Sequence, residues 1–167
     1  MKKTTRETIG AFIIISVAYI ASYTLVAGFI APLQELILPT FTTSISLLFL
    51  PHGIRILAAY YYGWKALPLL FPSMYLMWFI TVYANNISLH PLSPLFSGIA
   101  CIIAVKFVFK NIKHIIEKEW KLLLLAGLVG SFLNGLSHSF LVYKSFLTIS
   151  FIGYTIGDIL GQILLML

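Results

Sequence analysis

The apolar run FLPHGIRILAAYYYGW, residues 49–64, contains a proline, a histidine, a glycine and an arginine. An unpaired arginine in the hydrocarbon core of a membrane costs roughly 3 to more than 10 kcal/mol. Arg55 therefore needs either a carboxylate beside it or a polar cavity around it. His52 adds a ring that can make a structural hydrogen bond, hold a ligand or move a proton, and the first of these roles is the commonest.

The natural partner for Arg55 lies in the last apolar stretch, SFIGYTIGDILGQILLML, where Asp158 is near the middle. Three glycines recur there every four residues and predict a smooth face for close packing in cis or in trans: Gly153, Gly157 and Gly161. Three polar side chains repeat at the same spacing, one position along: Tyr154, Asp158 and Gln162. We expect both stripes to face the protein interior.

Scarcity of charge predicts that Arg55 and Asp158 form a buried pair, directly or through one water. In the competing interpretation Arg55 lies shallower and faces a cavity for an anionic ligand. Asp158 is then hydrogen-bonded independently to Tyr154, Gln162 or Asn134. The sequence leaves both interpretations open.

The stretch before it supplies further polar groups, because Asn134 and His138 lie one turn apart. Small residues at Gly127, Ser131 and Gly135 form a second stripe in that stretch. Depth counting puts Asn134 level with Asp158, and puts His138 in an outer layer together with His52. The two layers require the helices that carry these residues to be neighbours.

Enzymatic patterns are missing from the sequence. It has no His-Glu-x-x-His helix, no Gly-x-Ser-x-Gly turn, no second buried carboxylate and no glycine-rich phosphate loop. The lone Cys101 excludes a disulfide framework and is expected to be a packed small hydrophobe. We therefore expect a protein that is not an enzyme, with no cofactor and no metal.

The composition of the chain indicates what kind of structural elements position these residues. Hydrophobic residues make up 60% of the chain and charged residues only 10%, with a mean hydropathy of +0.99, which indicates a membrane protein. The formal charge of +6 is explained by membrane topology, so we expect no nucleic acid partner.

The expected fold class is all-α: a polytopic transmembrane helical bundle in one domain, residues 1–167. Stretches of about 20 apolar residues predict six spans: about 9–33, 46–64, 66–84, 94–109, 122–143 and 146–167. The second span is expected to be broken near Pro51–Gly53. An extended or re-entrant stretch, SLLFL, would precede a helix that starts at Pro51.

Basic residues predict that both termini face the cytoplasm of a bacterial inner membrane. The inner side receives the N-terminal lysines, Lys65 and the loop 106–121, whereas the outer side receives only Lys144. That loop is either a lipid-touching connector or a docking segment for a cytoplasmic protein, through five lysines: Lys106, Lys110, Lys113, Lys118 and Lys121.

One family resemblance rests on the run FLPHGIRILAAYYYGWKALPLLFPSMYL, residues 49–76. It resembles the start of the first type of membrane-associated sensor domain, found ahead of bacterial diguanylate cyclases and histidine kinases. The matching positions are Phe49, Pro51, Gly53, Gly63, Lys65 and Pro68, with Gly157, Asp158 and Gly161 in a later helix. The chain departs from the family pattern in three ways. Arg55 stands where the family is generally apolar, the chain is shorter than the family's domain, and the sequence shows no counterpart of the output domain that the family carries.

The resemblance implies a membrane sensor that reports to a separate cytoplasmic partner, and we expect it to act as a homo-oligomer. One alternative is the substrate-binding membrane component of a small-molecule importer, for which Ala27-x-x-x-Ala31 would be a contact with the transport partner. Another is the oligomeric membrane subunit of a bacterial defence pair that recruits a soluble effector.

Overall fold

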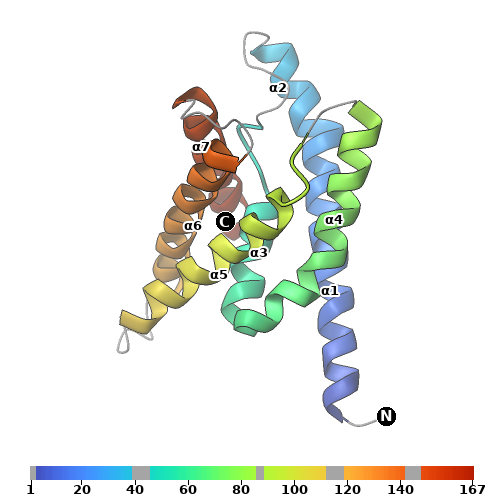
Figure 1. The fold of residues 1–167 in the computed structure, drawn as a ribbon, viewed down its shortest axis with the longest axis vertical. Coiled ribbons are helices and arrows are strands. Elements are labelled where there is room, and N and C mark those ends of the chain that lie inside the picture. Colours follow the sequence, from blue (N-terminus) through green and yellow to red (C-terminus); the bar gives the residue numbers. More distant parts are fainter. Residues whose placement is uncertain (1–2, 39–45, 86–88, 112–118, 142–147) are drawn as a thin grey trace.

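A computed structural model of the chain describes residues 3–38, 46–85, 89–111, 119–141 and 148–167. Helices make up nearly all of these residues, and no strand occurs among them. Figure 1 shows the helices gathered into one bundle, with the N-terminal end of the first helix projecting from it. The predicted all-α fold class is confirmed.

The chain begins with one long helical stretch made of three elements. These are α1 (Lys3–Leu25), the π-helical turn η1 (Val26–Ile30) and α2 (Ala31–Ile37). Pro32 lies in the first turn of α2, directly after the π turn. The sequence predicted a helix here but not the π turn, a feature that is frequent at functional sites.

Residues 46–50, which we call the approach segment, are not helical, and α3 (Pro51–Tyr62) begins directly after them. The approach segment is held at both sides: the Phe49 N–H donates to the Gly157 carbonyl at 2.8 Å, and the Leu47 N–H donates to Gln34 Oε1 at 2.8 Å. A helix that starts at Pro51 after a non-helical approach is therefore confirmed.

The break predicted in the second span, residues 46–64, is observed at Pro51, where the helix begins. At about 1.5 Å per residue, the 12 residues of α3 cover roughly 18 Å of a hydrocarbon core about 30 Å thick. The reason is local: the backbone N–H of Phe49 is bonded to α7, so the chain before Pro51 does not continue the helical ladder.

The chain reverses at Gly63, which has a φ of 55° and follows the last residue of α3. Glycine adopts this left-handed conformation without strain, so it ends the helix. A 3₁₀ turn, η2 (Gly63–Lys65), then leads into α4 (Ala66–Asn85). Figure 1 shows α4 running back along α1, which it contacts.

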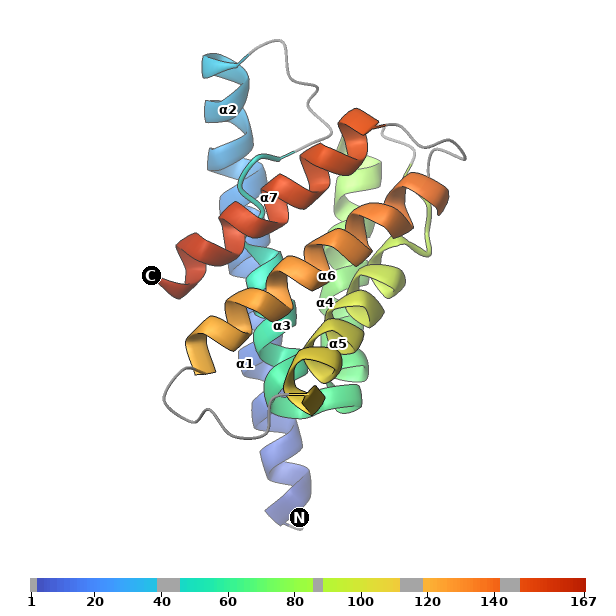
Figure 2. The ribbon, with the colours of Figure 1, turned by 90° about the vertical axis from the view of Figure 1, so that its left-hand side faces the viewer.

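Three more helices complete the bundle: α5 (Ser93–Asn111), α6 (Glu119–Leu141) and α7 (Thr148–Met166). Figure 2 shows α6 and α7 side by side, with α5 next to α6. Helix α3 contacts α5, α6 and α7. The predicted neighbourhood of the helices that carry Arg55, Asn134 and Asp158 is thus observed.

Four helical stretches of the described residues are long and apolar enough to cross a membrane: Thr5–Ile37, Pro51–Ala84, Ser93–Lys110 and Glu119–Ser139. The apolar stretch Phe151–Met166 is shorter, and Pro51–Ala84 contains the reversal at Gly63. These helices identify an integral membrane protein. The number of six crossings stays a prediction.

Basic side chains gather at one end of the bundle. Lys65 follows α3, Lys106 and Lys110 lie near the end of α5, and Lys121 lies at the start of α6, all exposed. The Lys106 ammonium lies 5.0 Å from the centre of the Trp64 ring, so α5 and η2 meet there. The predicted docking lysines Lys113 and Lys118 fall outside the described residues.

Candidate functional site

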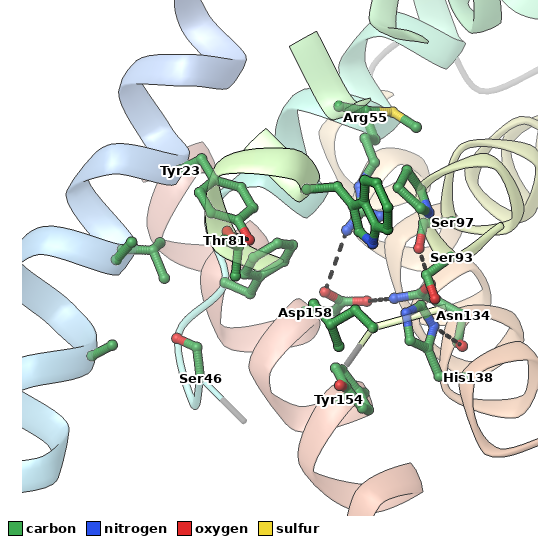
Figure 3. Close-up of a pocket in the computed structure, with 18 of the residues that line it drawn as sticks. Tyr23, Ser46, Arg55, Thr81, Ser93, Ser97, Asn134, His138, Tyr154 and Asp158 are labelled. Carbon is green, nitrogen blue, oxygen red and sulfur yellow. Dashed lines mark hydrogen bonds and ion pairs between the residues drawn. The ribbon is translucent and has the colours of Figure 1, made fainter. Parts of the chain in front are cut away.

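A cavity of about 570 Å³ lies between the helices, with walls from η1, the approach segment and each of the helices α1 to α7. This volume is within the usual range of small-molecule sites. Its rim includes Pro32 and Glu35 of α2, which are exposed. Figure 3 shows Arg55, Asp158, Asn134 and His138 along one wall and Tyr23 and Thr81 across from them.

Asp158 is the centre of the polar wall and is only 1% exposed. Its Oδ2 accepts a hydrogen bond of 2.6 Å from the Asn134 side-chain amide and lies 3.2 Å from His52 Nδ1. A carboxylate oxygen can only accept, so Nδ1 carries the hydrogen in that contact. Asp158 thus has two donors in addition to any contribution from Arg55.

Arg55 lies beside this carboxylate but is not closely bonded to it. Its Nη2 is 3.7 Å from Asp158 Oδ1, an ion-pair distance that exceeds a hydrogen bond. The Arg55 side chain is 4% exposed, and its Nε and Nη2 have no hydrogen-bond partner among the described residues. The Phe49 ring covers the guanidinium at 5.4 Å. Part of each interpretation is therefore observed. Arg55 and Asp158 form an ion pair, and Arg55 also faces a cavity.

His52 is completely buried and connects three helices. Its Nδ1 faces Asp158, while its Nε2 lies 3.2 Å from both the Gly127 carbonyl and the Ser131 hydroxyl of α6. The Ser131 hydroxyl donates its hydrogen to Gly127 at 2.8 Å. Both ring nitrogens of His52 thus lie next to acceptors. Cys101 is buried at 3.8 Å from this ring.

Asn134 extends the polar wall to α5 and along α6. The Ser97 hydroxyl donates to Asn134 Oδ1 at 2.6 Å, and His138 Nδ1 donates to the Asn134 carbonyl at 3.0 Å. The His138 ring stacks on Tyr154 with centroids 4.7 Å apart. Tyr154 and His138 both line the cavity. No group of three or more His, Cys, Asp or Glu side chains in the described part of the chain is placed to hold a metal ion.

The expected pairing of the two histidines in one layer is wrong. His52 contacts Gly127 and Ser131, which precede Asn134 in α6, whereas His138 follows Asn134 by one turn. The cause is the position of α3, whose first turn packs against the middle of α6 and the C-terminal half of α7. A Cβ on Gly53 would meet Leu165 and the Gln162 backbone.

The glycine face of α7 is buried, as expected, but its partner is not a helix. A Cβ on Gly157 would collide with the Ser46 carbonyl, and one on Gly161 would collide with the Phe49 backbone. This part of the face is therefore covered by the approach segment of the same chain.

The second small-residue stripe, which lies on α6, packs directly against α7. A Cβ on Gly127 would occupy the space of the Gln162 amide, whose Nε2 donates to the Leu123 carbonyl at 2.8 Å. A Cβ on Gly135 would meet Thr155 and Phe151. Gln162 thus holds α6 against α7 and lies away from Asp158's hydrogen bonds.

Sequence reasoning missed several polar residues of the cavity, among them Trp78 of α4 and Ser93 of α5. Trp78 Nε1 and Ser93 Oγ are buried without a hydrogen-bond partner in the described ranges. One signal was present: tryptophan is enriched at membrane interfaces, and Trp78 lies well inside its apolar stretch.

Comparison of the chain with protein-family models, curated proteins and solved structures found no match. The resemblance to membrane-associated sensor domains stays a prediction. Function is therefore argued from the cavity and its wall.

Proposed function

We propose that this protein is a non-enzymatic sensor of a bacterial cytoplasmic membrane, which binds a small molecule in the cavity and reports its presence to a separate cytoplasmic protein. The observation that carries the proposal is the 570 Å³ cavity with the Arg55–Asp158 pair in its wall. Buried charges in membrane helices are costly and usually mark binding or transport paths.

The direction of signalling follows from the order of residues along each helix. Cavity residues lie early in α3 and α5 and late in α6, whereas the basic residues lie at the opposite ends of the same helices. With the basic end in the cytoplasm, as the positive-inside rule requires, the cavity is on the outer side. Helix α3 joins the two, because Arg55 lies in its first half and Trp64 and Lys65 follow its last residue.

The importer component is the second candidate, and the same outward-facing cavity favours it. Ala27 and Ala31, the residues of its predicted contact with the transport partner, both line the cavity. Co-purification with an ATPase pair would favour import, and co-purification with a soluble kinase would favour sensing. Homo-oligomerisation and the defence-pair function stay predictions.

Ligand binding is tested by blocking the cavity. Ala31→Trp adds bulk to the cavity wall, and Ala84→Trp is the matched control because Ala84 is exposed and outside the wall. We expect at least one of 3-phenylpropionate, 3-phenylpropanamide and 3-phenylpropylamine to raise the melting temperature of the wild type and of Ala84→Trp in detergent. Ala31→Trp should not respond, and the probe should be recovered chemically unchanged.

If all three compounds leave the wild-type melting temperature unchanged at millimolar concentration, the proposed function is wrong. An equal rise for Ala31→Trp and the wild type would place binding outside the cavity and would contradict it as well. Recovery of a converted compound would contradict the non-enzymatic part.

A further inference from the structure

Three hydrogen-bonding groups in the cavity wall are buried and unsatisfied. They are Arg55 (Nε and Nη2), Trp78 (Nε1) and Ser93 (Oγ), and none of these atoms has a hydrogen-bond partner within the described residues. They come from three consecutive α-helices, α3, α4 and α5. Leaving a buried donor unsatisfied is costly, and in proteins such groups are nearly always paired.

All three of these groups can donate hydrogen bonds, and two of them cannot accept any. A guanidinium and an indole N–H can only donate, and the serine hydroxyl can also donate. A ligand that satisfies them must therefore present hydrogen-bond acceptors. Guanidinium groups bind carboxylates especially well, because two parallel hydrogen bonds form with a planar partner.

Asp158 does not use up the donors of Arg55. Its Oδ2 already receives hydrogen bonds from Asn134 and His52, and the nearest Arg55 nitrogen remains 3.7 Å from Oδ1. His52 offers a positive partner for this carboxylate when both of its nitrogens carry hydrogen, which suits the acceptors beside each nitrogen. The other carboxylate at the cavity, Glu35, is exposed at the rim, where water and salt screen its charge.

Two features of the remaining wall agree with an anion on an apolar body. Ser93 and Pro94 start α5, so the positive end of the dipole of this 19-residue helix lies at the cavity. Apolar and aromatic side chains line other parts of the wall, among them Tyr19, Val26, Phe49 and Met74. Figure 3 shows Arg55, Asp158, Ser93 and Ser97 on one side of the cavity, with the hydroxyl groups of Tyr23, Thr81 and Ser46 on the other.

We propose that the ligand is an organic carboxylate with an apolar or aromatic body, whose carboxylate binds Arg55, Trp78 and Ser93. This inference rests on the proposed function and specifies its ligand class. The carboxylate lies next to the guanidinium, and the body occupies the apolar part of the cavity.

Affinity measurements on the purified chain test the ligand class. We expect 3-phenylpropionate to bind the wild type at least ten times more tightly than 3-phenylpropanamide or 3-phenylpropylamine, which share its aromatic body. Trp78→Phe and Ser93→Ala each remove one hydrogen-bonding group and should weaken 3-phenylpropionate binding about three- to tenfold. Trp120→Phe is the matched control, since Trp120 is 59% exposed and outside the cavity wall, and it should bind like the wild type.

The outcomes separate this inference from the proposed function. If the amide or the amine binds as tightly as the carboxylate and Ala31→Trp abolishes that binding, the cavity binds ligands but the carboxylate inference is wrong. Unchanged carboxylate affinity in both Trp78→Phe and Ser93→Ala would also overturn it. If none of the three compounds binds, the proposed function and this inference fail together.

Discussion

Replacing Asp158 by leucine is expected to lower the free energy of unfolding by about 3–5 kcal/mol, the usual result of removing one partner from a buried charge pair. The change removes the acceptor or counter-charge of three groups at once, because Asn134, His52 and Arg55 all face this carboxylate. Helices in lipid gain little from hydrophobic burial against one another, so polar contacts carry more of the packing energy. Unfolding in mixed micelles of increasing dodecyl sulfate content measures the loss.

Arg55→Met should lose at least about 1.5 kcal/mol less than Asp158→Leu, since Arg55 Nε and Nη2 make no hydrogen bond to give up. The double variant should lose less than the sum of the two single losses, because removing both charges leaves neither one alone. The rescue is partial, as His52 and Asn134 still lack their acceptor. Strictly additive losses would show that the 3.7 Å pair is not energetically coupled. Asp158→Asn gives a milder version for the same cycle.

Gly161→Ala is the second change with a large expected effect. The added Cβ would collide with the Phe49 backbone and approach the Leu50 nitrogen. Backbone atoms cannot rotate away as a side chain does, so the approach segment must separate from α7. We expect a loss of about 3 kcal/mol, at the upper end for overpacking. The hydrogen bond from the Phe49 N–H to Gly157 would weaken as well.

Gly10→Ala is its matched control, because a Cβ at Gly10 meets nothing within 4 Å. Alanine is the better helix former by roughly 1 kcal/mol, so this variant should be neutral or more stable. Equal melting temperatures for Gly161→Ala and Gly10→Ala would mean that the approach segment does not pack against α7.

Displacing the approach segment also moves the Phe49 ring away from the Arg55 guanidinium, so Gly161→Ala should weaken carboxylate binding too.

Much of the fold was predictable because membrane helices follow a simple physical rule. Apolar length set the positions of α4, α5, α6 and α7 to within a few residues. Pro51 predicted the start of α3, since proline suits a first helical turn. The scarcity of charge in apolar stretches drew attention to Arg55 and Asp158, which lie together.

Other features depend on contacts that no local pattern specifies. The glycines of α7 predicted close packing, but their spacing gives no sign that an irregular backbone would be the partner. Depth counting used only the position of each residue along its own span and could not show which turn of α6 meets α3, so it misplaced His52 relative to His138. Trp78 and Ser93 were missed because a hydropathy pattern does not show which polar atoms lack a partner.

The central claim is that a cavity beside Arg55 is open to the outer face and attracts anions. The most direct measurement is the labelling rate of Ser93→Cys in intact cells, in a Cys101→Ala background, with membrane-impermeant thiosulfonates carrying either a sulfonate or a trimethylammonium group. We expect the sulfonate reagent to react faster, Ala31→Trp to slow both reagents, and Lys113→Cys to react only after the cells are permeabilised. The claim is contradicted if Ser93→Cys does not react, or if Ala31→Trp leaves its labelling rate unchanged. It is also contradicted if the cationic reagent reacts faster, or if Lys113→Cys is labelled from outside in intact cells.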